Sequence, residues 1–390
     1  VRELDAPRAT AIPTHLLTTD ARSLILGADI VIELLGGIEP AREYLMLALN
    51  SGADVITANK ALLATHGPEL FEVAEQVGAQ LYYEAAVGGA IPIIRPLRDS
   101  LAGDRVHRIL GIVNGTTNYI LDRMDVEGGS LEEALAAATE LGYAEADPTA
   151  DIGGYDAAQK AAILASLAFH TTVPLELVHR EGITAITHEQ VASARKAGFV
   201  IKLLAVCERL TDPDTGIEGV SARVHPALVP LTHPLAAVHG ANNAVFLEAE
   251  AAGSLMFYGA GAGGIQTASA VLGDVVSAAR RHVIGGPGVA ESTHADLPIL
   301  PISSVVTRYQ ITLQVADRPD RDSVQRPRRL GRGRGSVGRS RRARQRSGRR
   351  RGHRYPGNRN ASGHRGRARR HGCGPGRERC GHSGDQRSAR

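Results

Sequence analysis

The stretch "ADIVIELLGGIEPA" at residues 28–41 decides the fold class. Its first eight residues form a nearly continuous apolar run, which is typical of a strand buried on both faces of a parallel sheet. Two glycines follow, and Pro40 suits the first turn of a helix, where its missing N–H has no intrahelical partner. The stretch therefore predicts a strand, a glycine turn that a ligand can approach, and a helix.

The same alternation continues to residue 87. "DVITA" at 54–58 predicts a second strand, and "QLYYEAAV" at 80–87 predicts a third. Between them a helix is expected at 68–77, again opened by a proline and closed by a glycine. A β-α-β-α-β order builds a parallel, doubly wound sheet. We therefore expect an α/β fold with a partial Rossmann-type parallel sheet.

Residues 86–290 have a different pattern, in which helices alternate with widely spaced strands. Helices are expected at 91–102, 130–141, 154–170, 188–197 and about 265–282. Strands are expected at 105–113, 199–207, 219–225, 244–250 and 255–259. Such spacing favours a mixed sheet with helices on one face. This part is predicted to be an α+β domain.

Charge divides the chain into two unlike parts. Residues 321–390 hold 24 arginines, no lysine and three acids, a net charge of +21. Residues 1–320 hold 21 basic and 38 acidic side chains, a net charge of −17. The overall charge of +4 describes neither part, and an argument for nucleic-acid binding from it would be wrong for the body. The tail, at 320–390, has too few large apolar residues to bury a core, and we expect it to be disordered.

Two origins of the arginine-rich tail are open. One is an RGG-like arm that binds nucleic acid. The other is translation of GC-rich DNA in a shifted reading frame, which yields mainly Arg, Gly, Pro, Ala and Ser. The absence of lysine and the abrupt break after the alternating strand "RYQITLQVADRP" at 308–319 favour the shifted frame. A nucleic-acid partner is therefore not expected.

Cysteine usage and hydropathy bear on the compartment. Cys207 is the only cysteine before the tail, which suits a reducing cytosol and offers no disulfide framework. No window reaches the roughly 18 consecutive apolar residues of a membrane helix. The first ten residues lack the apolar core of a signal peptide. We expect a soluble, cytoplasmic protein without a membrane partner.

The stretch "GYAEADPTADIGGYDAAQKAAILA" at 142–165 crowds four acids ahead of one lysine. Asp156 and Lys160 are four residues apart and share one helix face. A surface ion pair of small energetic value is one interpretation. A half-buried catalytic pair is the other, because the helix around it is alanine-rich, and buried lysines have depressed pKa values that allow proton exchange near neutrality. Spacing alone does not decide between them.

Several loops that follow strands could contact a ligand. "TANKALLA" at 57–64 places Lys60 after a strand end, where ligands bind in open α/β sheets, although a solvated loop lysine is the alternative. "GAGAGG" at 259–264 could present N–H groups to a phosphate, but it is weak alone. "EAAVGGAIP" at 84–92 could form an oxygen cage for a hard cation, with a tight structural turn as the default. "NGTTN" at 114–118 suits helix capping and substrate contact equally.

Six stretches in one order identify a family: "GGIEPA", "TANKALLA", "YYEAAVGGAIPIIRPL", "GIVNGTTNYIL", "GYAEADPTADIGGYDAAQKAAILA" and "GAGAGG" followed by "VLGDV". Together they resemble homoserine dehydrogenase over roughly residues 1–319. Residues 142–165 are the most specific part, and the glycine loops are not specific. The resemblance implies reversible, NAD(P)H-dependent reduction of L-aspartate 4-semialdehyde to L-homoserine, on the route to threonine, methionine and isoleucine. The implied partners are a small-molecule substrate, NADP or NAD, a sodium ion and a second copy in a homodimer.

The resemblance also implies a domain plan. Its parts are a partial dinucleotide-binding domain (1–85), a substrate, catalytic and dimerisation domain (86–290) whose helix 265–282 packs back on the cofactor domain, a stub of an ACT-like domain (300–319), and the tail (320–390).

Site residues follow from the resemblance position by position. The family's proton donor to the nascent alkoxide matches Lys160, with Asp156 beside it as the second catalytic residue. Substrate contacts, chiefly to the ammonium group, are implied for Glu145, Asp151, Asp156 and Thr116. Cofactor contacts are implied for Lys60, Gly142, Gly263 and, more loosely, Gly36. The sodium site is implied at Glu84 and the main-chain oxygens of Val87, Gly89 and Ile91.

Two departures from the family pattern lead to further expectations. No GxGxxG loop precedes residue 28, so cofactor affinity should fall steeply. The strand at 308–319 resembles the start of an ACT domain, which the tail replaces, so feedback control should be absent. On both grounds this polypeptide is expected to be an inactive or poorly folding fragment. Two rivals remain: an arginine-rich nucleic-acid-binding protein on an inactive α/β scaffold, and a dehydrogenase for another semialdehyde or a sugar.

Overall fold

The computed structural model describes residues 4, 10–285 and 291–311, which belong to one compact unit. The expected disorder at 320–390 and the ACT-like start at 312–319 lie outside the described residues. Residues 308–311, the described part of the strand expected at 308–319, are not in a strand. Among the described residues, every helix is too short or too polar to cross a bilayer.

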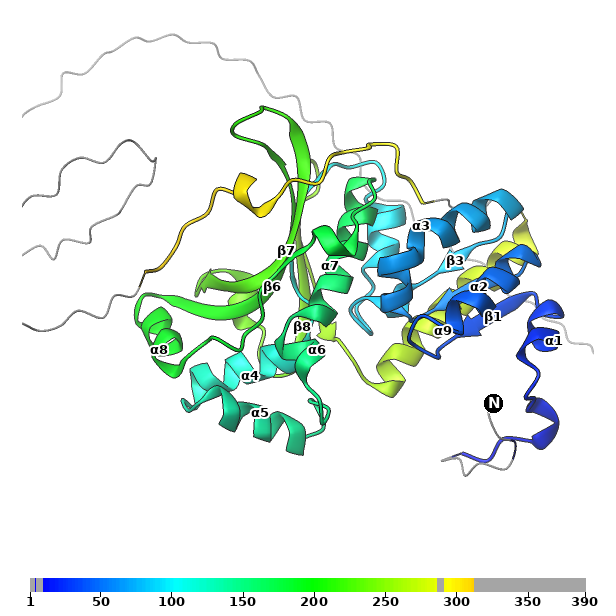
Figure 1. The fold of residues 1–390 in the computed structure, drawn as a ribbon, viewed down its shortest axis with the longest axis horizontal. Helices are drawn as coiled ribbons and strands as arrows, with labels where there is room; N and C mark the ends of the chain where they lie inside the picture. Colours follow the sequence, from blue (N-terminus) through cyan, green and yellow to red (C-terminus); the bar gives the residue numbers. More distant parts are fainter. Residues whose placement is uncertain (1–3, 5–9, 286–290, 312–390) are drawn as a thin grey trace, which may run out of the picture. The chain divides into compact units, whose positions relative to one another are not determined.

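The first sheet has three parallel strands in the order β1-β2-β3 (Figure 1). They are β1 (Ile30–Glu33), β2 (Asp54–Thr57) and β3 (Leu81–Tyr82). The parallel Rossmann-type order is confirmed, but the third strand is much shorter than the expected 80–87. It stops because Glu84 donates its N–H to Asp274 Oδ2, 3.0 Å away, and the chain turns into the 3₁₀ helix η2 (Glu84–Ala86).

Helices cover both faces of this sheet: α1 (Ala21–Leu26), α2 (Ala41–Asn50), α3 (Lys60–Val77) and α9 (Gly264–Ile284). Val55 of β2 packs in a cluster with side chains of α2 and α3, whereas its neighbour Ile56 packs with Val271 of α9. Because neighbouring strand residues point to opposite faces, α9 lies on the face away from α2 and α3.

The predicted start of α3 is wrong. The helix begins at Lys60 rather than Pro68, because the side chain of Asn59 accepts the N–H of Leu62 and caps it. Pro68 lies inside the helix, where it removes one backbone hydrogen bond. Lys60 is therefore the first residue of a helix, not part of a loop. The predicted end holds, with Gly78 in the left-handed conformation (φ 74°).

The second sheet has six strands in the order β5-β7-β6-β4-β8-β9, antiparallel except for the β5–β7 pair. The strands are β4 (Val106–Ile112), β5 (His179–Arg180), β6 (Phe199–Thr211), β7 (Glu218–Pro230), β8 (Asn242–Ala249) and β9 (Gly253–Ala260). The expected mixed sheet is confirmed. The β6–β7 hairpin extends well beyond the predicted strands.

The helices of this part pack mainly on one face of the six-stranded sheet, as expected. They are α4 (Gly115–Val126), α5 (Leu131–Glu140), α6 (Thr149–Ile152), α7 (Tyr155–Phe169) and α8 (His188–Lys196). α7 lies across β4, β6 and β7, and α4 contacts β6 and β8. The opposite face carries a smaller cluster under η5 (Pro234–Ala237). Short 3₁₀ turns complete the described chain: η1 (Thr14–Leu16), η4 (Leu175–Leu177) and η6 (Ile302–Ser304).

Two helix predictions fail in this part. The helix expected at 91–102 is only a π-type turn, η3 (Pro96–Ser100), because the N–H groups of residues 93–95 bond to the carboxylate of Glu84. Helix α4 was not predicted, since "NGTTN" reads as a turn, and yet Asn114 caps it.

Candidate active site

Helix α7 positions the charged pair singled out in the sequence. Gly154, in the left-handed conformation (φ 79°), precedes the helix and lets it start against Arg180 and Val224. Asp156 lies in its first turn and Lys160 one turn later. The alanines around them are buried against the six-stranded sheet, so this face of the helix is closed to solvent.

Lys160 is buried, with 8% of its surface exposed. Its Nζ donates to Asp156 Oδ2 and to the carbonyl oxygen of Val113, each at 2.7 Å. An ammonium group has three N–H donors, so one donor is left for a ligand. The surface-pair interpretation of Asp156 and Lys160 is therefore excluded.

Asp156 is the centre of the cluster. Its Oδ1 lies 3.3 Å from Lys60 Nζ, at the start of α3, and its Oδ2 accepts from Lys160 and from Asn114 Nδ2. Burial opposes ionisation of Asp156, but the charges of Lys160 and Lys60 outweigh it and lower its pKa to about 2. The carboxylate is therefore ionised at neutral pH, and it joins two lysines from different sheets.

Asn114, which the sequence analysis did not select, links the two inner acids. Its Nδ2 donates to Asp151 Oδ1 at 2.6 Å and to Asp156 Oδ2 at 3.0 Å, while its Oδ1 caps α4 by accepting from Thr117 N. Burial raises the pKa of Asp151, and the Asn114 hydrogen bond opposes that shift. The signal was an asparagine directly after an apolar strand.

Thr116 and Glu145 are placed differently. Thr116 is buried and donates to the carbonyl oxygen of Tyr143 at 2.7 Å, which ties α4 to the segment between α5 and α6. Glu145 and Gly142 lie on that segment and are exposed. Within the described part of the chain, Glu145 makes no hydrogen bond or ion pair, so the structure does not bring it into the cluster.

The loops after β1 and β2 are joined to each other. Buried Glu33 accepts the N–H groups of Leu35 and Gly36 and the hydroxyl of Thr57. The side chain of Asn59 donates to the carbonyl oxygen of Gly37 at 2.7 Å. Gly36 is exposed in the left-handed conformation (φ 72°), with open space where a side chain would be. A ligand can therefore reach the backbone there.

The glycine loop before α9 packs against the turn after η2. Gly263 precedes the helix with φ 125°, a conformation that favours glycine. A Cβ added to Gly89 would lie 2.5 Å from the carbonyl oxygen of Gly261. The close approach of these two backbones requires glycine and fixes the entrance to α9.

The geometry around Glu84 bears on the expected cation cage. Glu84 Oε1 accepts the N–H groups of Ile93 and Ile94, at 2.6 and 2.8 Å, and Oε2 accepts that of Arg95 at 2.9 Å. Burial raises the pKa of Glu84, and these hydrogen bonds oppose the shift. The carboxylate keeps one free acceptor position on Oε2. Among the described residues, no three acids, histidines or cysteines gather as a metal site.

The main-chain oxygens expected in that cage are those of Val87, Gly89 and Ile91. No hydrogen bond between described residues uses them. Their free lone pairs and the remaining position on Glu84 are compatible with a hard cation that takes oxygen ligands.

Two cavities lie beside the cluster rather than in it. One, of about 470 Å³, is lined mainly by α3 and α7 and includes Phe71, Tyr83 and Ile163. The other, of about 580 Å³, includes Tyr155 and Arg180. Neither is lined by Asp151, Asp156 or Lys160. The catalytic assignment therefore rests on the hydrogen bonds and charges described above.

Comparisons with known proteins agree with this geometry. The family model described as "Homoserine dehydrogenase" matches residues 92–276, and that of "Homoserine dehydrogenase, NAD binding domain" matches residues 1–84. The homoserine dehydrogenase of Mycobacterium tuberculosis is 59% identical over 310 residues, which make up 79% of this chain and 70% of that protein.

Solved structures give the same result. The homoserine dehydrogenase of Thiobacillus denitrificans is 43% identical with a TM-score of 0.70, over 74% of this chain and 67% of that chain. A hyperthermophilic archaeal homoserine dehydrogenase in complex with NADPH is 29% identical with a TM-score of 0.59, over 70% of this chain and 77% of that chain.

Proposed function

The chain belongs to the homoserine dehydrogenase family of NAD(P)-dependent oxidoreductases, and from this premise we propose that the cluster around Lys160 interconverts L-aspartate 4-semialdehyde and L-homoserine. The observation that carries the proposal is the free third N–H of the buried Lys160 ammonium. A carbonyl oxygen placed against this donor becomes more electrophilic at carbon. The alkoxide that forms there is stabilised by a fixed positive charge.

The proton for the alkoxide comes from Lys160. Asp156 cannot supply it, because its carboxyl is already ionised, with a pKa of about 2. When bound, the nicotinamide supplies the hydride. Reduction therefore places a hydride on the aldehyde carbon and the Lys160 proton on its oxygen, which balances the conversion of aldehyde to alcohol. In the oxidative direction, neutral Lys160 takes that proton from the hydroxyl group.

The acids of the cluster divide between two tasks. Asp156 holds Lys160 and Lys60 in place, whereas Asp151 faces the same side of α4 through Asn114 and offers negative charge to the substrate ammonium group. Glu145 contributes from the exposed segment that the Thr116 hydroxyl ties to α4. Thr116 keeps this segment next to the cluster and contacts the substrate.

The cofactor, NADP or NAD, is held by exposed backbone and one lysine. Gly36, Gly142 and Gly263 are exposed glycines with positive φ, to which a dinucleotide can come close. Lys60 lies between this part and the substrate acids, where its charge suits both ligands. The relative solved with NADPH supports a nicotinamide dinucleotide here. A sodium ion, held by Glu84, Val87, Gly89 and Ile91, would join the turn after η2 to the start of the catalytic part.

The wider setting belongs to the same proposal. The reaction serves threonine, methionine and isoleucine synthesis, takes place in the cytoplasm and is carried out by a homodimer. The domain plan proposed from the sequence also stands as a proposal. A nucleic-acid-binding role on an inactive scaffold is not favoured, because the catalytic lysine and its carboxylate partner are assembled.

Homoserine-dependent reduction of NAD⁺ or NADP⁺ by the purified protein tests the function. Lys160→Ala should lower turnover by about 10²–10⁴-fold, because a positioned general acid typically contributes that much. Cofactor binding, followed by NADPH fluorescence, should change little. Turnover of the variant at the wild-type rate would remove Lys160 from the mechanism.

A further inference from the structure

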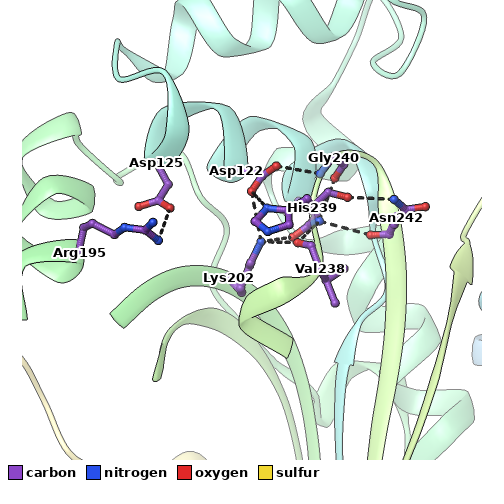
Figure 2. Close-up of polar contacts among 9 residues, drawn as sticks. Asp122, Asp125, Arg195, Lys202, Val238, His239, Gly240 and Asn242 are labelled. Atoms are coloured by element: carbon purple, nitrogen blue, oxygen red, sulfur yellow. Dashed lines mark hydrogen bonds and ion pairs between the residues drawn. The ribbon is translucent and has the colours of Figure 1, made fainter. Parts of the chain in front are cut away.

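A second buried lysine lies on β6, outside the catalytic cluster (Figure 2). Lys202 is only 2% exposed, and its Nζ donates to Val238 O at 2.7 Å and to Asn118 Oδ1 at 3.0 Å. Asp122 Oδ1 lies 3.9 Å from the same Nζ. Burial lowers the pKa of Lys202, and the charges of Asp122 and Asp125 oppose that shift. A buried ammonium carries a large desolvation penalty unless oxygen ligands surround it, as they do here.

The partners of Lys202 hold one loop against α4. Asn118 Nδ2 donates to the carbonyl oxygens of Val238, Gly240 and Asn242, at 3.2, 2.8 and 3.3 Å. Asp122 accepts from Gly240 N and bonds His239 Nδ1, each at 2.8 Å. The loop 238–242 is therefore fixed to α4 by two side chains, and Lys202 orients one of them while binding the loop itself (Figure 2).

The same face of α4 leads to the catalytic acids. Asn114, Asn118 and Asp122 are spaced by four residues, so they follow one side of the helix from its cap. A Cβ added to Gly115 would lie 2.5 Å from the carbonyl oxygen of Ala241. The first turn of α4 thus packs directly on the loop that Lys202 holds. A shift of this loop would move Asn114, which bridges Asp151 and Asp156.

We propose that Lys202 is a positioning residue of the active site, which locks the loop 238–242 onto α4 and thereby sets Asn114 between the two acids. Its kinetic consequence rests on the proposed function, but its structural consequence does not. Lys202 touches neither substrate nor cofactor. It acts through Asn118 and Gly115, along about one turn of helix.

The test compares Lys202→Met with Arg195→Gln. Both changes remove a cation that pairs with a carboxylate of α4, but Arg195 binds Asp125 Oδ2, at 3.1 Å, near the far end of the helix (Figure 2). Hydrogen exchange is measured by mass spectrometry on peptides that cover 113–120 and 238–242. We expect faster exchange in both peptides for Lys202→Met and no change in them for Arg195→Gln. Unchanged exchange in Lys202→Met overturns the proposal.

Steady-state kinetics is the second readout. Lys202→Met should lower kcat by about 10–100-fold, the effect of a small misplacement of catalytic groups, and leave KM for NADP⁺ unchanged. Arg195→Gln should leave kcat unchanged. A loss of thermal stability with an unchanged kcat in Lys202→Met would show a merely structural lysine and overturn the proposal. Lys202→Arg, which keeps a cation with several donors, should recover part of both the exchange protection and kcat.

Two further outcomes are kept distinct. If Lys202→Met does not fold, Asp122→Asn takes its place, since it weakens the same anchor of Gly240 and keeps the side-chain shape; the same exchange pattern is expected and its absence counts against the proposal. If the wild-type protein lacks homoserine-dependent turnover, the proposed function fails, and the exchange comparison still decides the role of Lys202.

Discussion

The two sheets carry their functional residues in opposite ways. Around the six-stranded sheet, Lys160, Asp156 and Asn114 are enclosed and bonded to one another. Around the three-stranded sheet, Gly36 and Gly263 offer exposed backbone with little side-chain contact. The chemistry is thus pre-organised before substrate arrives, whereas the grip on the cofactor depends on backbone that a ligand must approach. Substitutions in the enclosed part should therefore have larger effects.

The largest effect is expected for Lys160→Arg. Arginine keeps the positive charge beside Asp156, but its guanidinium does not release a proton at neutral pH. Turnover should fall by about 10²–10⁴-fold, as for loss of a general acid. The measurement is kcat for homoserine oxidation, with NADPH fluorescence titration as the control for cofactor binding. If the arginine variant kept most of its activity, charge alone would suffice and the enclosed site would need no proton donor.

Asn114→Ala should have the next largest effect. The change removes a helix cap, at about 1 kcal/mol, and the amide that spaces Asp151 from Asp156. We expect kcat to fall by about 10–100-fold. Ser130→Ala is the matched control, because Ser130 caps α5 through a capping box and contacts none of the cluster residues. Equal stability losses with equal kcat values would contradict the role of Asn114.

Acid stability gives a third test of the enclosed cluster. The folded-state pKa of Asp156, about 2, lies below the ordinary value of 3.8, so its ionisation stabilises the fold above pH 3.8 and this contribution is lost as pH falls toward 2. The difference in unfolding free energy between the wild type and Asp156→Asn should be about 2 kcal/mol at pH 6. Urea denaturation at pH 6, 4 and 3 should show this difference shrinking. A constant difference would mean that the paired charge is not its source.

The smallest effect is expected in the open part, from Gly36→Ala. The left-handed conformation of Gly36 disfavours a side chain by about 1–2 kcal/mol, although the space for a Cβ is open. Gly52→Ala is the matched control, since Gly52 also has positive φ (85°) and open space but lies in the turn before β2. Both variants should lose similar thermal stability, while only Gly36→Ala should raise KM for the cofactor. The same KM in both would separate this loop from cofactor binding.

Sequence reasoning predicted most strands and the charged helix because their patterns are local. The run at 28–35 and the alanine-rich helix at 154–170 identify themselves by periodicity. The start of α3 and the existence of α4 were missed for one reason: each helix begins with an asparagine cap inside a stretch that also reads as a turn. The capping oxygen of Asn59 or Asn114 decides the outcome, and both sequences contain turn-favouring residues.

The site shows the same limit at longer range. The spacing of Asp156 and Lys160 could be read from the chain, but their burial depends on β4, and the contact with Lys60 joins two separate sheets. Asn114 gains its bridging role only when α4, α6 and α7 meet. Glu84 illustrates the converse, since a carboxylate that suits a cation in sequence also serves as a cap for residues 93–95.

Helix α9 has a consequence for how the protein is made. It covers one face of β2, and Arg281 Nη1 bonds Asp54 Oδ1 at 2.8 Å across 227 residues of chain. At typical ribosomal rates, an interval of the order of 10–40 s separates synthesis of the strand from synthesis of its cover. During that time the apolar face with Ile56 stays bare. Nascent chains should therefore depend on chaperones, and slowing translation should increase aggregation rather than relieve it.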